Sequence, residues 1–327
     1  MSDLPKRLVY LGSDGIGLRV LQWLFSTAGS AIRLAGVVSG PDKRRGRGLR
    51  LQPNPITAWA RENNIPLLQP ERPREEILPW MLDLEADVGL VFAYGCILPK
   101  TLLDGISLGF LNLHPSLLPE LRGPSPIESA ILQRKTQTGV SLMKLVPAMD
   151  TGPVYATLAI DIAPEETTPT LREKVSHAAV EVLKKYLEAA LAGGLLPMEQ
   201  DHTKATYTKL IRKSDGLLDF NKPARDLEAQ IRAYTPWPGS FFIHNNKPTK
   251  VGRTEWREGN PSAELGTTLG IQNGALEVAT RDGILRIFEL QPPAGKMKKA
   301  ADHIITNYAT QHQPLSPSTL FSPQKPK

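Results

Sequence analysis

The residues best suited to catalysis stand in one stretch of the chain, residues 112–119 (NLHPSLLP). Asn112 and His114 are two residues apart, so on an extended strand both side chains point to the same side. Asp150 lies in the turn MDTG that follows a later apolar stretch. An amide and an imidazole can donate hydrogen bonds to a developing oxyanion, and an imidazole and a carboxylate can transfer protons. Asn112, His114 and Asp150 are therefore candidate catalytic residues; from the residue types alone, a structural role for His114 stays open.

A short apolar segment follows this Asn-x-His pair. It consists of Ser116, Leu117, Leu118 and Pro119. Such a turn is stiff, because proline fixes its own φ angle. Most of its side chains are also apolar. We expect it to form a wall for a flat ligand beside the candidate catalytic residues.

A strongly basic segment, residues 41–55 (PDKRRGRGLRLQPNP), indicates a second ligand. Its cations stand within eight residues and are Lys43, Arg44, Arg45, Arg47 and Arg50. Glycines and flanking prolines disfavour a helix, so we expect a mobile loop at the C-terminal end of a predicted strand. Because guanidinium groups pair with phosphates in a bidentate manner, a nucleic acid is the expected partner. A solvated run of charge is the alternative.

The glycine-rich turn of residues 12–17 (GSDGIG) follows a strand and precedes a helix. Its spacing is not that of the dinucleotide fingerprint, and no convincing ribose-binding acid follows the second predicted strand. We therefore expect a tight connection between strand and helix, without a dinucleotide site.

The N-terminal part alternates strands and helices. Strands are expected at residues 7–11, 35–38 and 88–92, with a fourth that residues 107–113 enter, and helices at 18–25, 55–63 and 171–191. Alternation of this kind predicts an α/β fold with a doubly wound, Rossmann-like, mostly parallel sheet. We assign residues 1–192 to this catalytic domain.

The pattern changes after residue 192. Residues 193–207 are polar and marked by Gly and Pro, as expected for a linker. Beyond a helix at 224–234, short strands are expected at 241–243, 249–251, 267–271, 276–279 and 284–290, with Asn-Asn, Asn-Gly and Asp-Gly turns between them. This pattern predicts a smaller, OB-like β-barrel domain at 208–310, followed by a frayed tail at 311–327.

Charge is distributed unevenly between these parts. The net charge is +6, yet from Thr203 onward 18 Lys and Arg stand against 11 Asp and Glu. A basic C-terminal part favours a polyanionic partner, with simple solubility as the alternative.

The chain shows neither a membrane span nor a signal peptide, so a cytoplasmic protein is expected. The single cysteine, Cys96, excludes an internal disulfide; we expect it to be buried, and we expect no metal.

Together these motifs resemble the methionyl-tRNA formyltransferase family along almost the whole chain. The landmarks are PDKRRGRG (41–48), AYGCILPK (93–100), NLHPSLLPELRGPSPI (112–127), QTGVSLMKL (137–145), MDTG (149–152), YTPWPGSF (234–241) and GILRIFELQPPAGKM (283–297). The Asn-x-His-x-Ser-Leu-Leu-Pro motif with a distant Asp-Thr-Gly is specific for enzymes that use 10-formyltetrahydrofolate. The basic loop and the late LQPPAGK narrow the resemblance to the tRNA enzymes.

The resemblance implies transfer of a formyl group from 10-formyltetrahydrofolate to methionine on initiator tRNA by a monomer without metal. It implies catalytic roles for Asn112, His114 and Asp150, and a folate pocket lined by Ser116, Leu117, Leu118 and Pro119. The tRNA-binding residues that we assign are Arg45, Arg47, Lys209, Arg212 and Lys213. One departure is the first turn, which usually reads Gly-Thr-Pro and an acid in the family, but reads Gly-Ser-Asp-Gly at 12–15.

Three other functions stay open at this point. A formyltransferase for an aminosugar nucleotide would share Asn112, His114 and Asp150, without needing a basic loop. A formyl hydrolase would use water in place of the amine. A non-catalytic RNA-binding relative would be free to lose the three residues, and this chain retains them.

Overall fold

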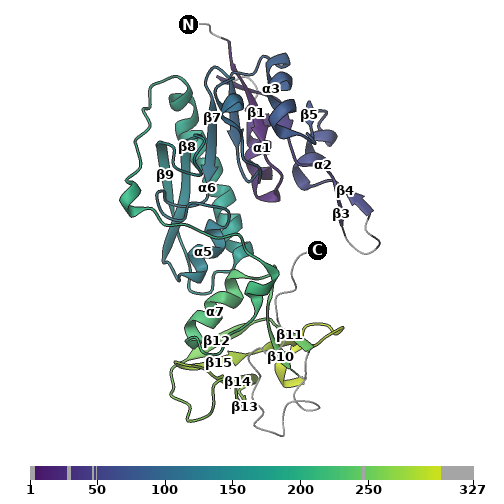
Figure 1. The fold of residues 1–327 in the computed structure, drawn as a ribbon, viewed down its shortest axis with the longest axis vertical. Helices are drawn as coiled ribbons and strands as arrows, with labels where there is room; N and C mark the ends of the chain where they lie inside the picture. Colours follow the sequence, from purple (N-terminus) through teal and green to yellow (C-terminus); the bar gives the residue numbers. More distant parts are fainter. Residues whose placement is uncertain (1–3, 28–30, 46–47, 49, 245–246, 303–327) are drawn as a thin grey trace. The chain divides into compact units, whose positions relative to one another are not determined.

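The computed structural model describes residues 4–27, 31–45, 48, 50–244 and 247–302 (Figure 1). The chain divides into two compact units. The first comprises residues 1–127, 137–162 and 170–209, and the second comprises residues 128–136, 163–169 and 210–327. The predicted tail at 311–327 and Arg47 lie outside the described residues.

A seven-stranded sheet forms the first unit, in the order β5-β2-β1-β6-β7-β8-β9. These strands are β1 (Lys6–Leu11), β2 (Ile32–Val38), β5 (Leu67–Leu68), β6 (Val88–Val91), β7 (Phe110–His114), β8 (Gln137–Lys144) and β9 (Val154–Asp161). The first five run parallel, whereas β8 and β9 pair antiparallel at one edge. The predicted α/β class with a mostly parallel sheet is confirmed.

Helices connect and cover these strands (Figure 1). They are α1 (Leu18–Ser26), α2 (Pro55–Glu62), α3 (Pro73–Asp83), α4 (Lys100–Leu103) and α6 (Thr168–Leu191), with short 3-10 turns η1 (Gly15–Gly17) and η2 (His202–Lys204). Most of α5 (Pro126–Leu132) belongs to the second unit. Helix α2 starts where Asn54 accepts a hydrogen bond from the Thr57 amide at 3.0 Å, with proline at its first position. The Asn54 amide also donates to Ser39 at 2.9 Å, which fastens this start to the end of β2.

The core of the first unit lies along its central strands. Leu8, Val9, Tyr10 and Leu11 of β1 are all fully buried. Each such aliphatic side chain stabilises the fold by about 1.5–3 kcal/mol relative to an exposed position. A strand buried on both faces is typical of a parallel sheet, and this explains why an unbroken apolar run forms β1.

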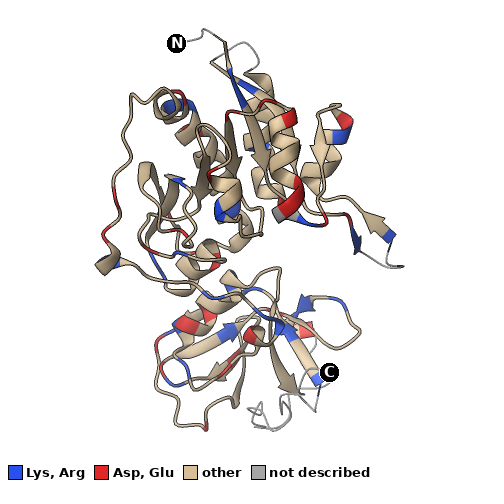
Figure 2. Cartoon of the chain, turned by 45° about the horizontal axis from the view of Figure 1, so that its top comes forward, with Lys and Arg blue, Asp and Glu red and all other residues tan. Residues whose placement is uncertain are grey.

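The basic segment after β2 forms an antiparallel ribbon rather than an irregular loop. Strand β3 (Lys43–Arg45) pairs with β4 (Arg50–Gln52), and the ribbon projects from the sheet with its cations on both strands (Figures 1 and 2). At its base, Asp42 accepts from Gln69 at 2.8 Å and from Arg61 at 3.1 Å. These hydrogen bonds, that from Gln69 first, lower the pKa of the Asp42 carboxyl. The carboxylate therefore fixes where the ribbon leaves the sheet.

Two four-stranded antiparallel sheets form most of the second unit. One contains β10 (Ser240–His244), β11 (Lys247–Val251), β16 (Glu289–Gln291) and β17 (Lys298–Lys299), and the other contains β12 (Thr254–Arg257), β15 (Ile284–Ile287), β14 (Ala275–Ala279) and β13 (Thr268–Gln272). The 3-10 turn η3 (Lys213–Gly216) and α7 (Ala224–Ala233) precede them. The sequence predicted a small OB-like β-barrel, and the structure confirms an antiparallel β domain, built from two four-stranded sheets. The run 284–290 forms two strands instead of one.

One apolar core serves both of these sheets. Leu227 and Ile231 of α7 are buried in the same cluster as Phe242, Val278 and Leu285. Strands β13 and β14 are joined at Asn273 and Gly274, with φ angles of 48° and 77°. Two positive φ angles are what a two-residue hairpin needs, as the Asn-Gly dipeptide predicts.

The segment expected to be a linker packs on the first unit. Met198 and Val154 exchange two backbone hydrogen bonds of 2.8 Å, and Thr206 and Thr208 bond the backbone of the turn that follows Pro119. These contacts depend on residues far apart in the chain, so polar composition alone did not reveal them.

The prediction that Cys96 is buried is wrong, because Cys96 is exposed. Its loop turns through Ala93 and Gly95, with φ angles of 51° and 79°. Tyr94 and Leu98 fill the core on either side, at 5% and 7% exposure. Burial raises the pKa of the Tyr94 hydroxyl.

Within the described part of the chain, no helix is long and apolar enough to cross a membrane.

Candidate active site

Strand β7 brings Asn112 and His114 to one side of the sheet. In its pairing with β8, Asn112 lies opposite Met143 and His114 lies opposite Ser141. Asn112 is half-buried and His114 is 4% exposed. His114 is the last residue of β7. In open parallel sheets the carboxyl ends of the strands are where ligands bind, so the pair stands at the expected edge.

Ser141 of β8 holds the turn that follows β7. Its hydroxyl donates to the Ser116 carbonyl at 2.7 Å and accepts from the Leu118 amide at 3.1 Å. Ser116 is fully buried, and its own hydroxyl donates to the Glu120 carbonyl at 2.6 Å. The Leu118–Pro119 peptide bond is cis. The Ser116 side chain therefore shapes the turn from within.

The rest of this turn presents apolar surface. Leu117, Leu118 and Pro119 are half-buried. A side chain at Gly139 of β8 would meet Leu117 at 2.4 Å, so the leucine lies directly over that glycine. The turn therefore carries partly exposed apolar side chains, and its role as a wall for folate stays a prediction.

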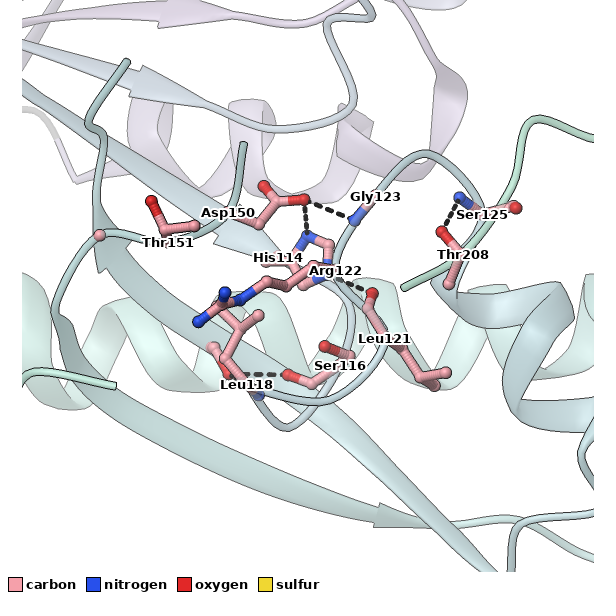
Figure 3. A network of polar contacts seen from close by, with 12 residues as sticks. His114, Ser116, Leu118, Leu121, Arg122, Gly123, Ser125, Asp150, Thr151 and Thr208 are labelled. Carbon is pink, nitrogen blue, oxygen red and sulfur yellow. Dashed lines mark hydrogen bonds and ion pairs between the residues drawn. The ribbon is translucent and has the colours of Figure 1, made fainter. Parts of the chain in front are cut away.

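His114 and Asp150 face each other beside this turn (Figure 3). His114 Nδ1 lies 3.6 Å from Asp150 Oδ2, with side chains 4% and 13% exposed. The other ring nitrogen, Nε2, lies 2.9 Å from the carbonyl oxygen of Leu121. Because a carbonyl can only accept, Nε2 carries a proton. A separation of 3.6 Å is longer than a hydrogen bond, so Nδ1 remains available to a substrate atom.

Asp150 is held by the loop that follows the turn. Its Oδ2 accepts from the Gly123 amide at 2.7 Å. Asp150 itself has a φ angle of 53°, in the left-handed region. Gly123 has a φ angle of 111°, and a side chain there would meet Thr208 at 2.7 Å, so only glycine fits. The structure thus brings His114 and Asp150 together, and the convergence of Asn112 with them stays a prediction.

A buried arginine beside the pair was missed as a functional candidate. Arg122 is 1% exposed and donates to Gln200 at 2.6 and 3.1 Å. Its Nη2 lies 2.9 Å from His202 Nδ1, and its guanidinium lies 5.9 Å from the centre of the Tyr207 ring. In the sequence, the one sign of its importance was its place within the NLHPSLLPELRGPSPI motif. Its hydrogen-bond partners lie in the segment that the sequence predicted to be a linker.

The first turn of the fold is closed by its own polar groups. Ser13 Oγ accepts from the Gly40 amide at 2.9 Å, and Asp14 accepts from the Ile16 amide at 2.9 Å and pairs with Arg172. A side chain at Gly12 would meet the Tyr10 hydroxyl at 2.5 Å. The turn is therefore the tight connection that the sequence predicted.

The residues predicted to bind tRNA are distributed over both units. Lys209 ends the first unit, Arg212 and Lys213 lie in the second, and all three are exposed. Arg45 ends β3, and Arg47 lies outside the described residues. Their contact with RNA stays a prediction.

Over the described ranges, no cluster of three or more His, Cys, Asp or Glu side chains could hold a metal ion.

Solved structures with this fold include a sugar formyltransferase and a protein solved with a folate. A sugar 3N-formyltransferase, WlaRD, superposes with a TM-score of 0.64 at 16% identity, over 89% of this chain and 98% of its own. HypX from Aquifex aeolicus, solved with tetrahydrofolic acid, gives a TM-score of 0.61 at 15% identity over 93% of this chain and 47% of its own. At such identities the likeness shows the fold alone.

Sequence comparison goes further. Residues 7–187 match the formyl transferase family and residues 210–307 match its C-terminal domain. The methionyl-tRNA formyltransferase of Myxococcus xanthus is 39% identical over 91% of this chain and 94% of its own length. That of Chloroflexus aurantiacus is 37% identical over 88% and 92%. On this evidence the chain belongs to the methionyl-tRNA formyltransferase family.

Proposed function

We propose that this enzyme transfers the formyl group of 10-formyltetrahydrofolate to the amino group of methionine carried on initiator tRNA, in the cytoplasm. The observation that carries the proposal is the buried His114–Asp150 pair at the carboxyl end of β7, beside an apolar turn. Family membership supports the reaction class, and the geometry supports the residue roles.

The reaction needs little from the protein beyond hydrogen bonds and proton transfer. The neutral amine attacks the formyl carbon, a C–N bond forms, and the carbonyl oxygen becomes an oxyanion. Collapse of this intermediate breaks the bond from carbon to N10 of the folate, which takes a proton, while the attacking amine loses one. A donor placed in advance at the oxyanion stabilises this step most.

Each site residue has a role that follows from its chemistry. The Asn112 amide can donate to the oxyanion from the same side of β7 as His114. His114 Nδ1, 3.6 Å from Asp150, can donate to it when the ring is protonated. Asp150 then balances the imidazolium and accepts the amine proton directly or through water.

The folate donor fits the apolar side of this site. Its flat ring system requires apolar walls, and Leu117, Leu118 and Pro119 offer them beside His114. Ile97, 71% exposed, follows β6, the parallel neighbour of β7. Loops after adjacent parallel strands meet at one edge of a sheet, so Ile97 can add to the same wall.

The tRNA is the partner that the basic groups favour. The β3–β4 ribbon and Lys209, Arg212 and Lys213 supply cations for phosphates, with Arg45 and Arg47 assigned from the sequence. Contacts of this kind position an RNA without reading its bases. We infer a monomer, because nothing in the proposed reaction needs a second copy.

An acceptor panel separates this function from its alternatives. The chain is incubated with 10-formyltetrahydrofolate and, in parallel, initiator methionyl-tRNA, an aminosugar nucleotide, or no acceptor. Formylation of the tRNA alone supports the proposal. Formylation of the sugar would identify a sugar formyltransferase, and formate release without acceptor would identify a hydrolase.

A further inference from the structure

The turn that carries Asp150 places this residue in the left-handed region of backbone conformation. At a φ angle of 53°, Asp150 lies where residues other than glycine are uncommon. Within the turn, the Thr151 amide reaches the Ala148 carbonyl only at 3.5 Å. Such a backbone persists only where surrounding groups hold it. The Thr151 hydroxyl adds a bond of 3.1 Å to the same Ala148 carbonyl. Groups outside the turn can therefore add to the hold on Asp150.

Gln200 supplies this hold on the backbone side. Its Nε2 donates to the Asp150 carbonyl at 2.9 Å and to the Gly152 carbonyl at 2.7 Å. Gln200 is 8% exposed. Both hydrogens of one buried amide are thus used on the two carbonyls that flank Thr151.

Arg122 fixes the orientation of that amide. Its Nη2 and Nε donate to Gln200 Oε1 at 2.6 and 3.1 Å. With the oxygen facing a guanidinium, the Gln200 nitrogen must face the two carbonyls. The next residue, Gly123, donates to the Asp150 carboxylate at 2.7 Å. Two consecutive residues therefore hold Asp150: Gly123 bonds its carboxylate directly, and the buried Arg122 acts on its backbone through Gln200.

We propose that Gln200, oriented by Arg122, is a positioning residue that holds the Asp150 carboxylate toward His114. The proposal rests on the function proposed above. Gln200 acts through the backbone of Asp150, so it changes the chemical step without contributing a reacting group. Misplacing a catalytic group by about 1 Å can cost roughly 10² in rate.

Gln200→Glu is the sharpest test of this role. The substitution keeps the side chain's size and an oxygen for Arg122, but it turns an oxygen toward the two carbonyls in place of the NH₂ donor. We expect kcat for formylation of initiator methionyl-tRNA to fall by roughly 10². The KM values of both substrates and the affinity for the folate donor should stay within about twofold of the parent.

Two further variants make the result decisive. Thr203→Ala is the matched control, because its exposed side chain bonds only Asp201 and should leave kcat unchanged. Gln200→Asn keeps the amide but is too short to reach Arg122 and both carbonyls, so its kcat should also fall. If the glutamate variant does not fold, the asparagine variant decides.

The outcomes separate this proposal from the function on which it rests. Parental kcat in a folded Gln200 variant, or a raised KM with kcat unchanged, would overturn the positioning role and leave the function standing. A parent chain that formylates no methionyl-tRNA would overturn both. Loss of kcat with KM and donor affinity retained supports both.

Discussion

Asp150 Oδ2 lies 3.6 Å from His114 Nδ1, although one residue ends β7 and the other lies in the turn before β9. The opposite nitrogen of the ring is fixed on the Leu121 carbonyl at 2.9 Å. The ring can therefore rotate little, and its free edge is directed at the carboxylate. This relationship makes the pair the centre of the reaction proposed here.

Replacing either member of the pair should reduce turnover while the fold survives. Asp150→Asn keeps the size and an acceptor for the Gly123 amide, but removes the charge that balances His114. We expect kcat to fall by roughly 10²–10⁴, and the same for His114→Ala. Asp104→Asn, which breaks an exposed pair with Lys100, is the control. Near-parental kcat in His114→Ala would contradict the mechanism.

Ser141→Ala should weaken the turn after β7. Loss of the hydroxyl leaves the buried Ser116 carbonyl and the Leu118 amide without their partner, at a cost of about 1–3 kcal/mol in the free energy of unfolding. The KM of the folate donor should rise, because Leu117 and Leu118 lose their fixed positions. Urea unfolding and steady-state kinetics measure the two effects.

The matched control for Ser141 is Ser26→Ala, whose exposed hydroxyl donates to Trp23 at the end of α1. Its stability should change by no more than about 0.5 kcal/mol. Equal stability losses in the two variants would show that the hydrogen bonds of the Ser141 hydroxyl do not stabilise the turn more than an exposed hydroxyl does.

The basic ribbon should act on the tRNA and leave the folate donor unaffected. In Arg45→Ala/Arg47→Ala we expect a higher KM for methionyl-tRNA and an unchanged KM for 10-formyltetrahydrofolate, because guanidinium groups contact phosphates. Arg33→Ala is the control, since this exposed cation lies near the opposite end of β2. Equal changes in both KM values would mean that the ribbon merely supports the fold.

Arg212 and Lys213 should contribute to the salt dependence of tRNA binding. On duplex nucleic acid, each cation that neutralises a phosphate adds about 0.9 to the steepness with which log affinity falls against log salt. Arg212→Ala/Lys213→Ala should therefore bind more weakly at low salt and with a shallower slope, measured by fluorescence titration. Lys185→Ala on α6 serves as the control. A slope identical to the parent's would remove these two cations from the RNA-binding surface.

The sequence predicted the parts of the fold whose signals are local. An apolar run predicted β1, Asn54 and Pro55 fit the start of α2, and Asn273-Gly274 predicted a hairpin. Helix α3 was missed, since Pro73 and Pro79 interrupt its pattern, although the first stands at the helix start, where proline is tolerated. Strands β8 and β9 were missed as well, and their pairing is visible only between segments.

The candidate site shows the same limit. The Asn-x-His spacing placed both side chains on one side of β7, and Asp150 was a candidate from its place in a turn after an apolar stretch. The sequence did not show that Asp150 lies 3.6 Å from His114. No local pattern showed that Arg122 is buried or that Gln200 bonds the Asp150 turn, because these contacts join positions far apart in the chain. Polar residues in a Gly- and Pro-marked stretch resemble a linker until the surface on which they pack is known.

The most direct measurement follows a labelled formyl group from 10-formyltetrahydrofolate to methionyl-tRNA, with the parent chain and His114→Ala side by side. We expect the parent to produce labelled N-formylmethionine on initiator tRNA, far faster than on elongator methionyl-tRNA. We expect the His114 variant to be slower by roughly 10² or more. No label on the tRNA with the parent, or equal rates for the parent and the variant, would contradict the proposed mechanism.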